Sequence, residues 1–141
     1  MKILRVIKWR MDELFFASAR LLFRQRKGGG VILLVRTDGI GDFVFFSRYL
    51  SSLRKAFVGH KLALVCRTET AELAGKIHAL DAVIGFRSLA YRWNYLYRLY
   101  VLHTIRSLRP DVAIYCTYHR MHVGDEMTLL SGAGRTIAMS G

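Results

Sequence analysis

The segment RTDGIGD, residues 36–42, combines charged residues and glycines in a way that could support chemistry. It directly follows the apolar run VILLV, as a turn between a buried strand and a helix would. Gly39 and Gly41 allow a tight turn and a close approach of a ligand to the backbone. The first turn of the following helix offers free N–H groups and the positive end of its dipole. A carboxylate there, Asp42, is favoured as an anion and can accept a proton as a general base. It could equally cap the helix, a frequent use of aspartate at a helix start.

Known nucleotide-binding motifs fit this turn poorly. No lysine follows Gly41, so the phosphate-binding loop of nucleoside triphosphatases is absent. The dinucleotide fingerprint G-x-G-x-x-G is half present, because Gly39 and Gly41 match but Val44 replaces the third glycine. The next apolar run ends in Arg67 without an acid, which disfavours NAD and leaves an NADP-binding module as an alternative.

The sequence also contains a candidate metal cluster. Cys116, His119, His122 and Asp125 have a spacing that zinc ligands sometimes show. The two histidines are closer than in most zinc pairs and no second cluster supports them, so we predict no metal. The cysteines, Cys66 and Cys116, each end an apolar run, which predicts reduced, buried thiols and suits the cytoplasm.

The order of apolar runs predicts the elements that position these residues. Strand-like runs alternate with helical ones, which indicates an α/β fold with a Rossmann-like parallel sheet and helices on both faces. Thr70 is a candidate helix cap, and Pro110 closes a long aromatic helix. The expected strands cover 31–36, 61–66, 81–86 and 111–116, with a fifth starting at 135, and the expected helices cover 42–57, 70–77, 88–108 and the segment EMTLLSG.

Residues 1–27 form a predicted basic amphipathic helix, followed by a glycine hinge at 28–30. Asp12 and Glu13 interrupt the apolar stretch, which excludes a secretory signal. The helix either packs its apolar stripe on the domain or lies in a membrane interface, and packing is slightly favoured. The stripe contains Leu4, Ile7, Met11, Leu14, Phe15 and Leu22, whereas Arg5, Lys8, Asp12, Arg20, Arg24 and Lys27 lie mostly on the opposite face.

Composition limits the class of partner. The 141 residues are 52% hydrophobic and carry 22 Lys and Arg against 10 acids, a formal net charge of +12. This charge predicts attraction to a polyanion such as nucleic acid, anionic lipid or a phosphorylated glycan. A non-catalytic basic domain that binds membranes or nucleic acid is therefore an alternative, although no known RNA-recognition motif is present and we predict no nucleic acid.

Two blocks of the sequence resemble glycosyltransferase family 9, the ADP-heptose:lipopolysaccharide heptosyltransferase-like enzymes. The first is ILLVRTDGIGDFVFFSRYLSSLRKAF, which is similar to the R-x-[DS]-x-x-G-D turn of the family and its L-R-x-[AF] helix end. The second is RPDVAIYCTYHRMHVGDEMTLLSGAGRTIAMSG, with the L-S-G-A-x-R-x-I segment at 130–137. The likeness covers about residues 31–141. Arg48, Val58, Tyr115 and the segment 138–139 depart from the family pattern.

The resemblance implies that residues 31–141 are the acceptor-binding N-terminal lobe of a two-lobed GT-B glycosyltransferase, truncated and inactive alone. It implies that Asp42 is the catalytic base and that the acceptor is an acidic glycolipid, similar to a lipopolysaccharide core. The nucleotide-sugar donor would bind mainly to an absent C-terminal lobe, without metal or cofactor. We expect a cytoplasmic enzyme, peripheral on the inner face of the cytoplasmic membrane and held on its anionic surface through residues 1–27. The acceptor-binding residues are expected to be Arg36, Thr37, Asp38, Gly39, Gly41, Tyr118, His119, Arg120 and Asp125.

Overall fold

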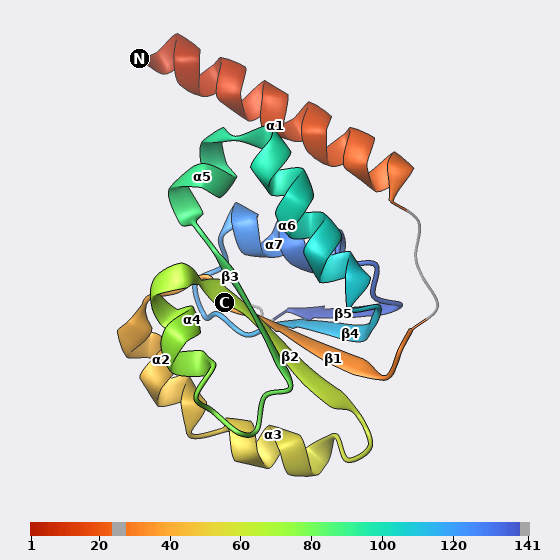
Figure 1. The fold of residues 1–141 in the computed structure, drawn as a ribbon. Helices are drawn as coiled ribbons and strands as arrows, with labels where there is room; N and C mark the ends of the chain where they lie inside the picture. Colours follow the sequence, from red (N-terminus) through yellow and green to blue (C-terminus); the bar gives the residue numbers. More distant parts are fainter. Residues whose placement is uncertain (24–27, 139–141) are drawn as a thin grey trace.

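The computed structural model of the chain describes residues 1–23 and 28–138. Its described part contains one parallel sheet of five strands in the order β3-β2-β1-β4-β5 (Figure 1). The predicted α/β, Rossmann-like fold is therefore confirmed. The strands are β1 (Val31–Val35), β2 (Lys61–Arg67), β3 (Ala82–Phe86), β4 (Pro110–Tyr115) and β5 (Arg135–Ala138).

Helices cover both faces of this sheet (Figure 1). On one face lie α2 (Ile40–Ser47), α3 (Leu50–Ala56) and α4 (Thr68–Ala74), and on the other lie α1 (Lys2–Leu22), α5 (Ser88–Trp93), α6 (Tyr95–Ser107) and α7 (His122–Leu129). Alternate residues of β1 therefore enter different cores. Leu33 packs with α6 and α7, whereas Leu34 packs with Phe43 and Leu50. Because both faces are buried, β1 is apolar at every position.

The helix predicted over 42–57 is two helices. The helical pattern breaks after Ser47, whose hydroxyl donates a 2.7 Å hydrogen bond to the carbonyl of Val44 and competes with the helical bonding of the backbone. The N–H of Tyr49 then bonds to the carbonyl of Phe46, three residues back. Beside this break Val44 and Tyr49 are exposed, whereas Phe43 and Leu50 are buried.

The helix predicted over 88–108 is also interrupted, at Asn94. The side chain of Asn94 accepts a 3.0 Å hydrogen bond from the N–H of Tyr97 and caps α6.

The helix cap that the sequence predicts at Thr70 is wrong. The helix α4 already begins at Thr68, so Thr70 lies inside it, and its hydroxyl is buried there without a hydrogen-bond partner among the described residues.

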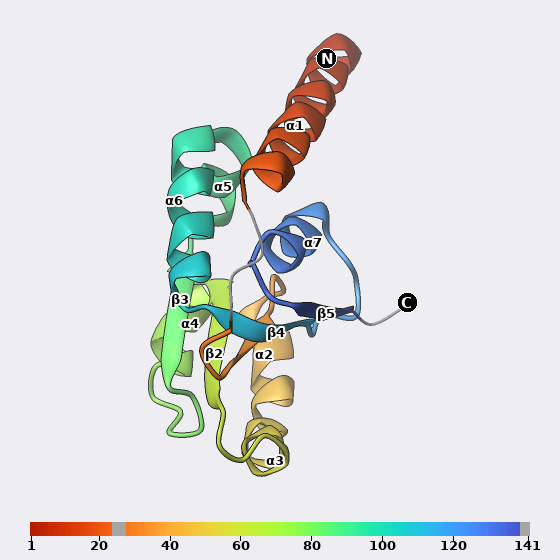
Figure 2. The same cartoon turned by 90° about the vertical axis from the view of Figure 1, so that its right-hand side faces the viewer.

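The N-terminal helix packs its apolar side chains on the domain through its second half, and Lys8 of the first half contacts Trp93 and Tyr95. Phe15, Phe16 and Ala19 join the core under α6, whereas residues 1–7 are exposed and extend away from the body (Figures 1 and 2). The predicted helix extends to residue 27, but 24–27 lie outside the described residues. Gly28 then lies so close to Asp111 that a side chain at this position would clash with it. None of the described helices is both long and apolar enough to span a bilayer.

Candidate functional site

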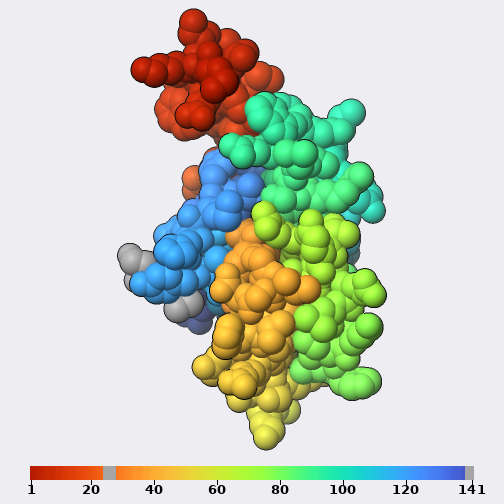
Figure 3. All heavy atoms as spheres, turned by 90° about the vertical axis from the view of Figure 1, so that its left-hand side faces the viewer, coloured from red at the N-terminus to blue at the C-terminus, as the bar shows by residue number. Residues whose placement is uncertain are grey.

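The turn that contains Asp42 lies where the strand order of the sheet reverses. β1 pairs with β4, in register Val35 to Tyr115, and the helices after these two strands cover opposite faces. In open α/β sheets, ligands bind beyond the carboxyl ends of strands at such a switch point. Figure 3 shows the orange turn and α2 beside the blue surface of the loop after β4 and of α7. The two predicted blocks of site residues are therefore brought together.

Asp42 is the third residue of α2 and is exposed to solvent. Gly39 occupies the cap position, and no side chain caps this helix, so the alternative of Asp42 as the cap is wrong. Among the described residues, Asp42 has no hydrogen-bond or ion-pair partner. Its carboxylate is thus an accessible anion in the first turn of a helix, free to accept a proton from a bound group.

The two glycines of the turn are not required by the fold. Neither Gly39 nor Gly41 has a positive φ, and a methyl group built at either position would meet nothing within 4 Å. Gly41 is the second residue of α2, where the greater flexibility of glycine in the unfolded chain disfavours it relative to alanine. The open space at both glycines, just before Asp42, fits a site where a ligand approaches the backbone.

Arg36 has a different environment from the one expected of a ligand-binding arginine. Its guanidinium is buried, pairs with the carboxylate of Asp38, and donates a 3.0 Å hydrogen bond to the carbonyl of Cys116. It also lies 4.2 Å above the ring of Phe46. This corrects the expectation that Arg36 faces an acceptor anion, because its charge is compensated inside the protein. Arg36 and Asp38 instead fix the turn after β1 to the end of β4.

The hydroxyl of Tyr115 joins the two loops of the site. It lies 2.9 Å from the hydroxyl of Thr37 and accepts a 2.9 Å hydrogen bond from the N–H of Met121. Thr37 is buried, and its own N–H bonds to the hydroxyl of Thr117. Thr37 therefore positions the turn rather than presenting its hydroxyl to a ligand. Sequence reasoning missed Tyr115 as a connection, and its only signal was a hydroxyl within an apolar strand.

The loop after β4 supplies the exposed polar groups of the site. Tyr118, His119 and Arg120 are all solvent-exposed, and the rings of Tyr118 and His119 contact edge to face at 5.1 Å. Arg120 donates hydrogen bonds of 2.8 and 3.0 Å to Asp125, in the first turn of α7. This pair is half-exposed, so a ligand anion can reach the guanidinium.

The cysteines belong to the framework of this region. Cys66 and Cys116 are both free thiols, and burial raises the pKa of each to about 12. Neither is a thiolate at neutral pH, so neither is an activated nucleophile. The zinc spacing noted in the sequence does not produce a site either. Within residues 1–23 and 28–138, no group of three or more His, Cys, Asp and Glu is placed to hold a metal ion.

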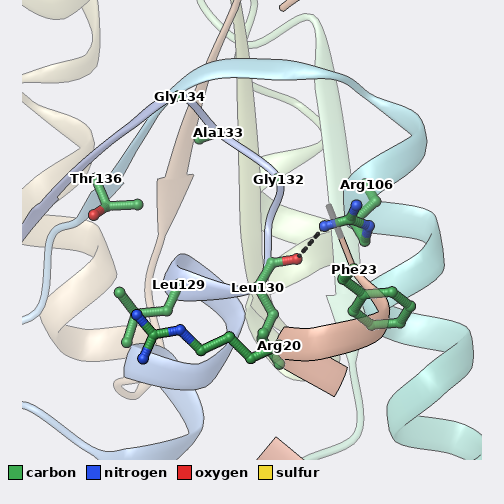
Figure 4. A pocket seen from close by; sticks show the side chains of 9 residues that line it. All are labelled: Arg20, Phe23, Arg106, Leu129, Leu130, Gly132, Ala133, Gly134 and Thr136. Atoms are coloured by element: carbon green, nitrogen blue, oxygen red, sulfur yellow. Dashed lines mark hydrogen bonds between the residues drawn. The ribbon is translucent and has the colours of Figure 1, made fainter. Parts of the chain in front are cut away.

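The cavity in Figure 4 lies at the opposite edge of the sheet, near the start of β5. It has a volume of about 290 Å³, and Arg20, Arg106 and Thr136 contribute to its wall. Arg106 donates a 3.1 Å hydrogen bond to the carbonyl of Leu130 and lies over the ring of Phe23, so its charge anchors α7 to α6. A second cavity also lies at the start of the strands, beside Lys61, and Asp42 lines neither of them.

Comparison with known proteins supports the fold at the level of structure. A crystal structure of a glycosyl transferase of family 9 from Veillonella parvula DSM 2008 matches with a TM-score of 0.69 and 18% sequence identity. The match covers 83% of this chain and 34% of that chain, so the chain spans about a third of the length of the matched protein. No protein-family model and no curated protein matches the sequence. The chain thus has the Rossmann-like fold of one half of a GT-B glycosyltransferase.

Proposed function

We propose that this chain is the acceptor-binding lobe of a glycosyltransferase of the heptosyltransferase type. The observation that carries the proposal is the turn at 39–42, where an exposed carboxylate without a partner among the described residues follows two glycines that the fold does not need. The turn lies at the switch point of the sheet, where the matched fold class binds ligands. The resemblance of residues 36–42 to the family turn assigns the base to Asp42.

The proposed reaction uses Asp42 as a general base. Its carboxylate takes the proton of an acceptor hydroxyl while that oxygen forms a bond to the anomeric carbon of the donor sugar. The bond from this carbon to the donor phosphate breaks, and the nucleoside diphosphate leaves with the bonding electrons. Asp42 is suited to this role because it is accessible and has no competing partner among the described residues.

The acceptor is proposed to be an acidic glycolipid similar to a lipopolysaccharide core. Arg120 is the proposed contact for a phosphate or carboxylate, because its guanidinium stays half-exposed beside Asp125 and an arginine binds such groups with two parallel hydrogen bonds. Tyr118 and His119 are the proposed contacts for sugar hydroxyls. The net charge of +12 favours an anionic acceptor of this kind.

The donor is proposed to bind mainly to a second lobe outside these 141 residues, as in two-lobed enzymes of the GT-B class. We propose that the complete enzyme works at the inner face of the cytoplasmic membrane, where its lipid-linked acceptor would be found. The chain spans about a third of the matched glycosyltransferase, which leaves room for such a lobe.

The test compares two exposed carboxylates of the complete gene product. Asp42→Asn is expected to lower the rate of sugar transfer by roughly 10²–10⁴-fold without changing donor affinity. Glu69→Gln is the matched control, because Glu69 is likewise exposed in the first turn of the helix after the neighbouring strand. Release of nucleoside diphosphate from ADP-heptose, with a lipopolysaccharide-core glycolipid as acceptor, measures transfer. Equal rates for wild type and Asp42→Asn would remove Asp42 from the mechanism.

A further inference from the structure

The first half of α1 presents a continuous apolar stripe to solvent. Ile7 and Leu14 lie at its centre, seven residues or about two turns apart. The other members share their face at spacings of three, four or seven residues. All of these side chains are between 47% and 75% exposed, far more than the core-facing residues of an amphipathic helix should be. The stripe consists of Ile3, Leu4, Ile7, Met11 and Leu14.

The stripe is distinct from the face by which α1 packs on the domain. Asp12, Phe15 and Ala19 contact α6 and the core, and they lie about a third of a turn around the helix from the stripe. The large apolar residues of the first half of α1 are therefore not buried by the described fold. Two exposed apolar side chains of the domain lie near this end of α1, Trp93 and Leu96, and the ammonium of Lys8 lies 5.6 Å from the Trp93 ring.

The direction of α1 relates the stripe to the candidate site. Lys8 contacts the α5–α6 junction, which follows the carboxyl end of β3, whereas Phe23 contacts Arg106 near the other edge of the sheet. The helix therefore projects past the carboxyl ends of the strands, the edge that holds Asp42 and the loop after β4 (Figure 1). A surface that binds the projecting half lies on the side from which a ligand reaches this edge.

We infer that α1 is an interfacial helix that docks this edge of the protein on an anionic phospholipid bilayer through the stripe. Helices of this kind carry one apolar face together with basic residues whose long side chains reach lipid headgroups. Arg10 borders the stripe, one turn before Leu14, and Lys2, Arg5 and Arg20 are exposed on the opposite side of the helix, where they add to its positive charge. A second copy of the chain fits the stripe less well, because dimerisation would bring two basic helices and two charges of +12 together.

A buried charge network holds the docking helix at a fixed angle to the domain. Arg98, only 3% exposed, donates a 2.6 Å hydrogen bond to Asp12 of α1 and pairs with Glu126 of α7. Its guanidinium also lies 4.3 Å from the ring centroid of Phe15. Because α7 begins directly after the loop at 118–121, one residue connects the membrane-docking helix to the helix that carries Asp125. The inference does not depend on sugar transfer.

The test measures vesicle binding by the chain of residues 1–141, using co-sedimentation with phosphatidylcholine vesicles that contain either no anionic lipid or about 30% phosphatidylglycerol. The stripe variant is Ile7→Ser with Leu14→Ser. Its matched control is Val6→Ser with Trp9→Ser, two exposed apolar positions of the same helix outside the stripe. A charge variant replaces Arg5 and Arg10 by glutamine, and circular dichroism verifies that all of these proteins are folded.

Wild type is expected to bind anionic vesicles at least about tenfold more tightly than neutral ones. The stripe variant should lose at least about tenfold in affinity, while its control stays within about twofold of wild type. The charge variant should lose affinity for anionic vesicles only. Equal binding by the stripe variant and wild type would overturn the inference. So would a dimer in sedimentation equilibrium, without vesicles, that the stripe variant abolishes, because a second copy would then be the occupant. No arm requires activity, so a failure here leaves the proposed sugar transfer standing, and the reverse also holds.

Discussion

Replacing Gly124 by alanine tests the packing that joins the two loops of the site. Gly124 lies in the first turn of α7, against the buried ring of Tyr115. A methyl group at this position would lie 2.2 Å from Cζ and 2.4 Å from the hydroxyl oxygen of that ring. Ordinary contact begins at 3.4 Å, so the ring or the helix must move by about 1.2 Å. Either movement weakens the hydrogen bonds of Tyr115 to Thr37 and Met121.

The expected effect has the opposite sign to the usual one for this substitution. Alanine in place of glycine normally stabilises a helix by about 1 kcal/mol. At Gly124, overpacking is expected to cost about 1–3 kcal/mol, and the weakened hydrogen bonds of Tyr115 about 1 kcal/mol each. We therefore expect the free energy of unfolding of Gly124→Ala to fall by about 2–4 kcal/mol. Gly41→Ala is the matched control in α2, where nothing lies within 4 Å, and it should be neutral or stabilising.

Urea unfolding, followed by circular dichroism, measures both variants. A double-mutant cycle with Tyr115→Leu isolates the contact, because leucine lacks the far ring atoms that the new methyl group would meet. In that background, Gly124→Ala should cost at least about 1.5 kcal/mol less than it does in wild type. If Gly124→Ala leaves the unfolding free energy within about 0.5 kcal/mol of wild type, or if the two substitutions are additive, the packing described here is wrong.

Three further predictions concern the charges and thiols of the fold. Hydrogen bonds from Arg54 and the backbone lower the pKa of Asp81 below its ordinary value of 3.8, so its stabilisation is present above about pH 4 and is lost as pH falls through the lowered pKa. Urea unfolding of Asp81→Asn between pH 7 and 3 should show a weaker loss of stability in acid than wild type. Burial would raise the pKa of Asp12, but the bonds from Lys8 and Arg98 outweigh it and lower the pKa. Asp12→Asn is therefore expected to lower the unfolding free energy by about 1–2 kcal/mol and to increase hydrogen exchange in α1 but not in α2, as mass spectrometry would show. Burial raises the pKa of Cys66 to about 12, so a thiol reagent at pH 8 should label it only when the chain is unfolded. A labelling rate equal to the unfolding rate would agree with this prediction.

The sequence predicts the central strands β1 and β2 well because burial on both faces leaves a clear signal. Runs such as VILLV at β1 are apolar at every position, and their alternation with helical patterns indicates a parallel sheet. The location of the site follows from the same logic. Once β1 and β4 are known to be neighbours, the polar residues after them must meet at one edge. Asp42 and the loop at 118–120 could therefore be identified without coordinates.

Other features depend on contacts that a linear pattern does not contain. The interruption at Asn94 lies within an aromatic run with helical periodicity. Only the hydrogen bond from the N–H of Tyr97 to the side chain of Asn94 shows that a second helix begins there. Arg36 has the residue type of an anion ligand, but its guanidinium is bonded to a carboxylate two positions later and to a carbonyl just after the neighbouring strand β4. Propensity and periodicity describe one segment at a time, and these outcomes involve partners from elsewhere.

Two segments of this chain depart from what its own folding favours, and they lie at the same edge. At α2, two glycines stand where the described protein leaves room for a side chain and needs no positive φ. At α1, large apolar side chains remain in water although the helix already has a packing face. Local rules of this kind are usually broken where a protein meets something other than itself. A catalytic turn would explain the glycines but leave the apolar stripe exposed, and a membrane surface would explain the stripe but not the turn. The proposed transferase, with an acceptor embedded in a bilayer, would account for both.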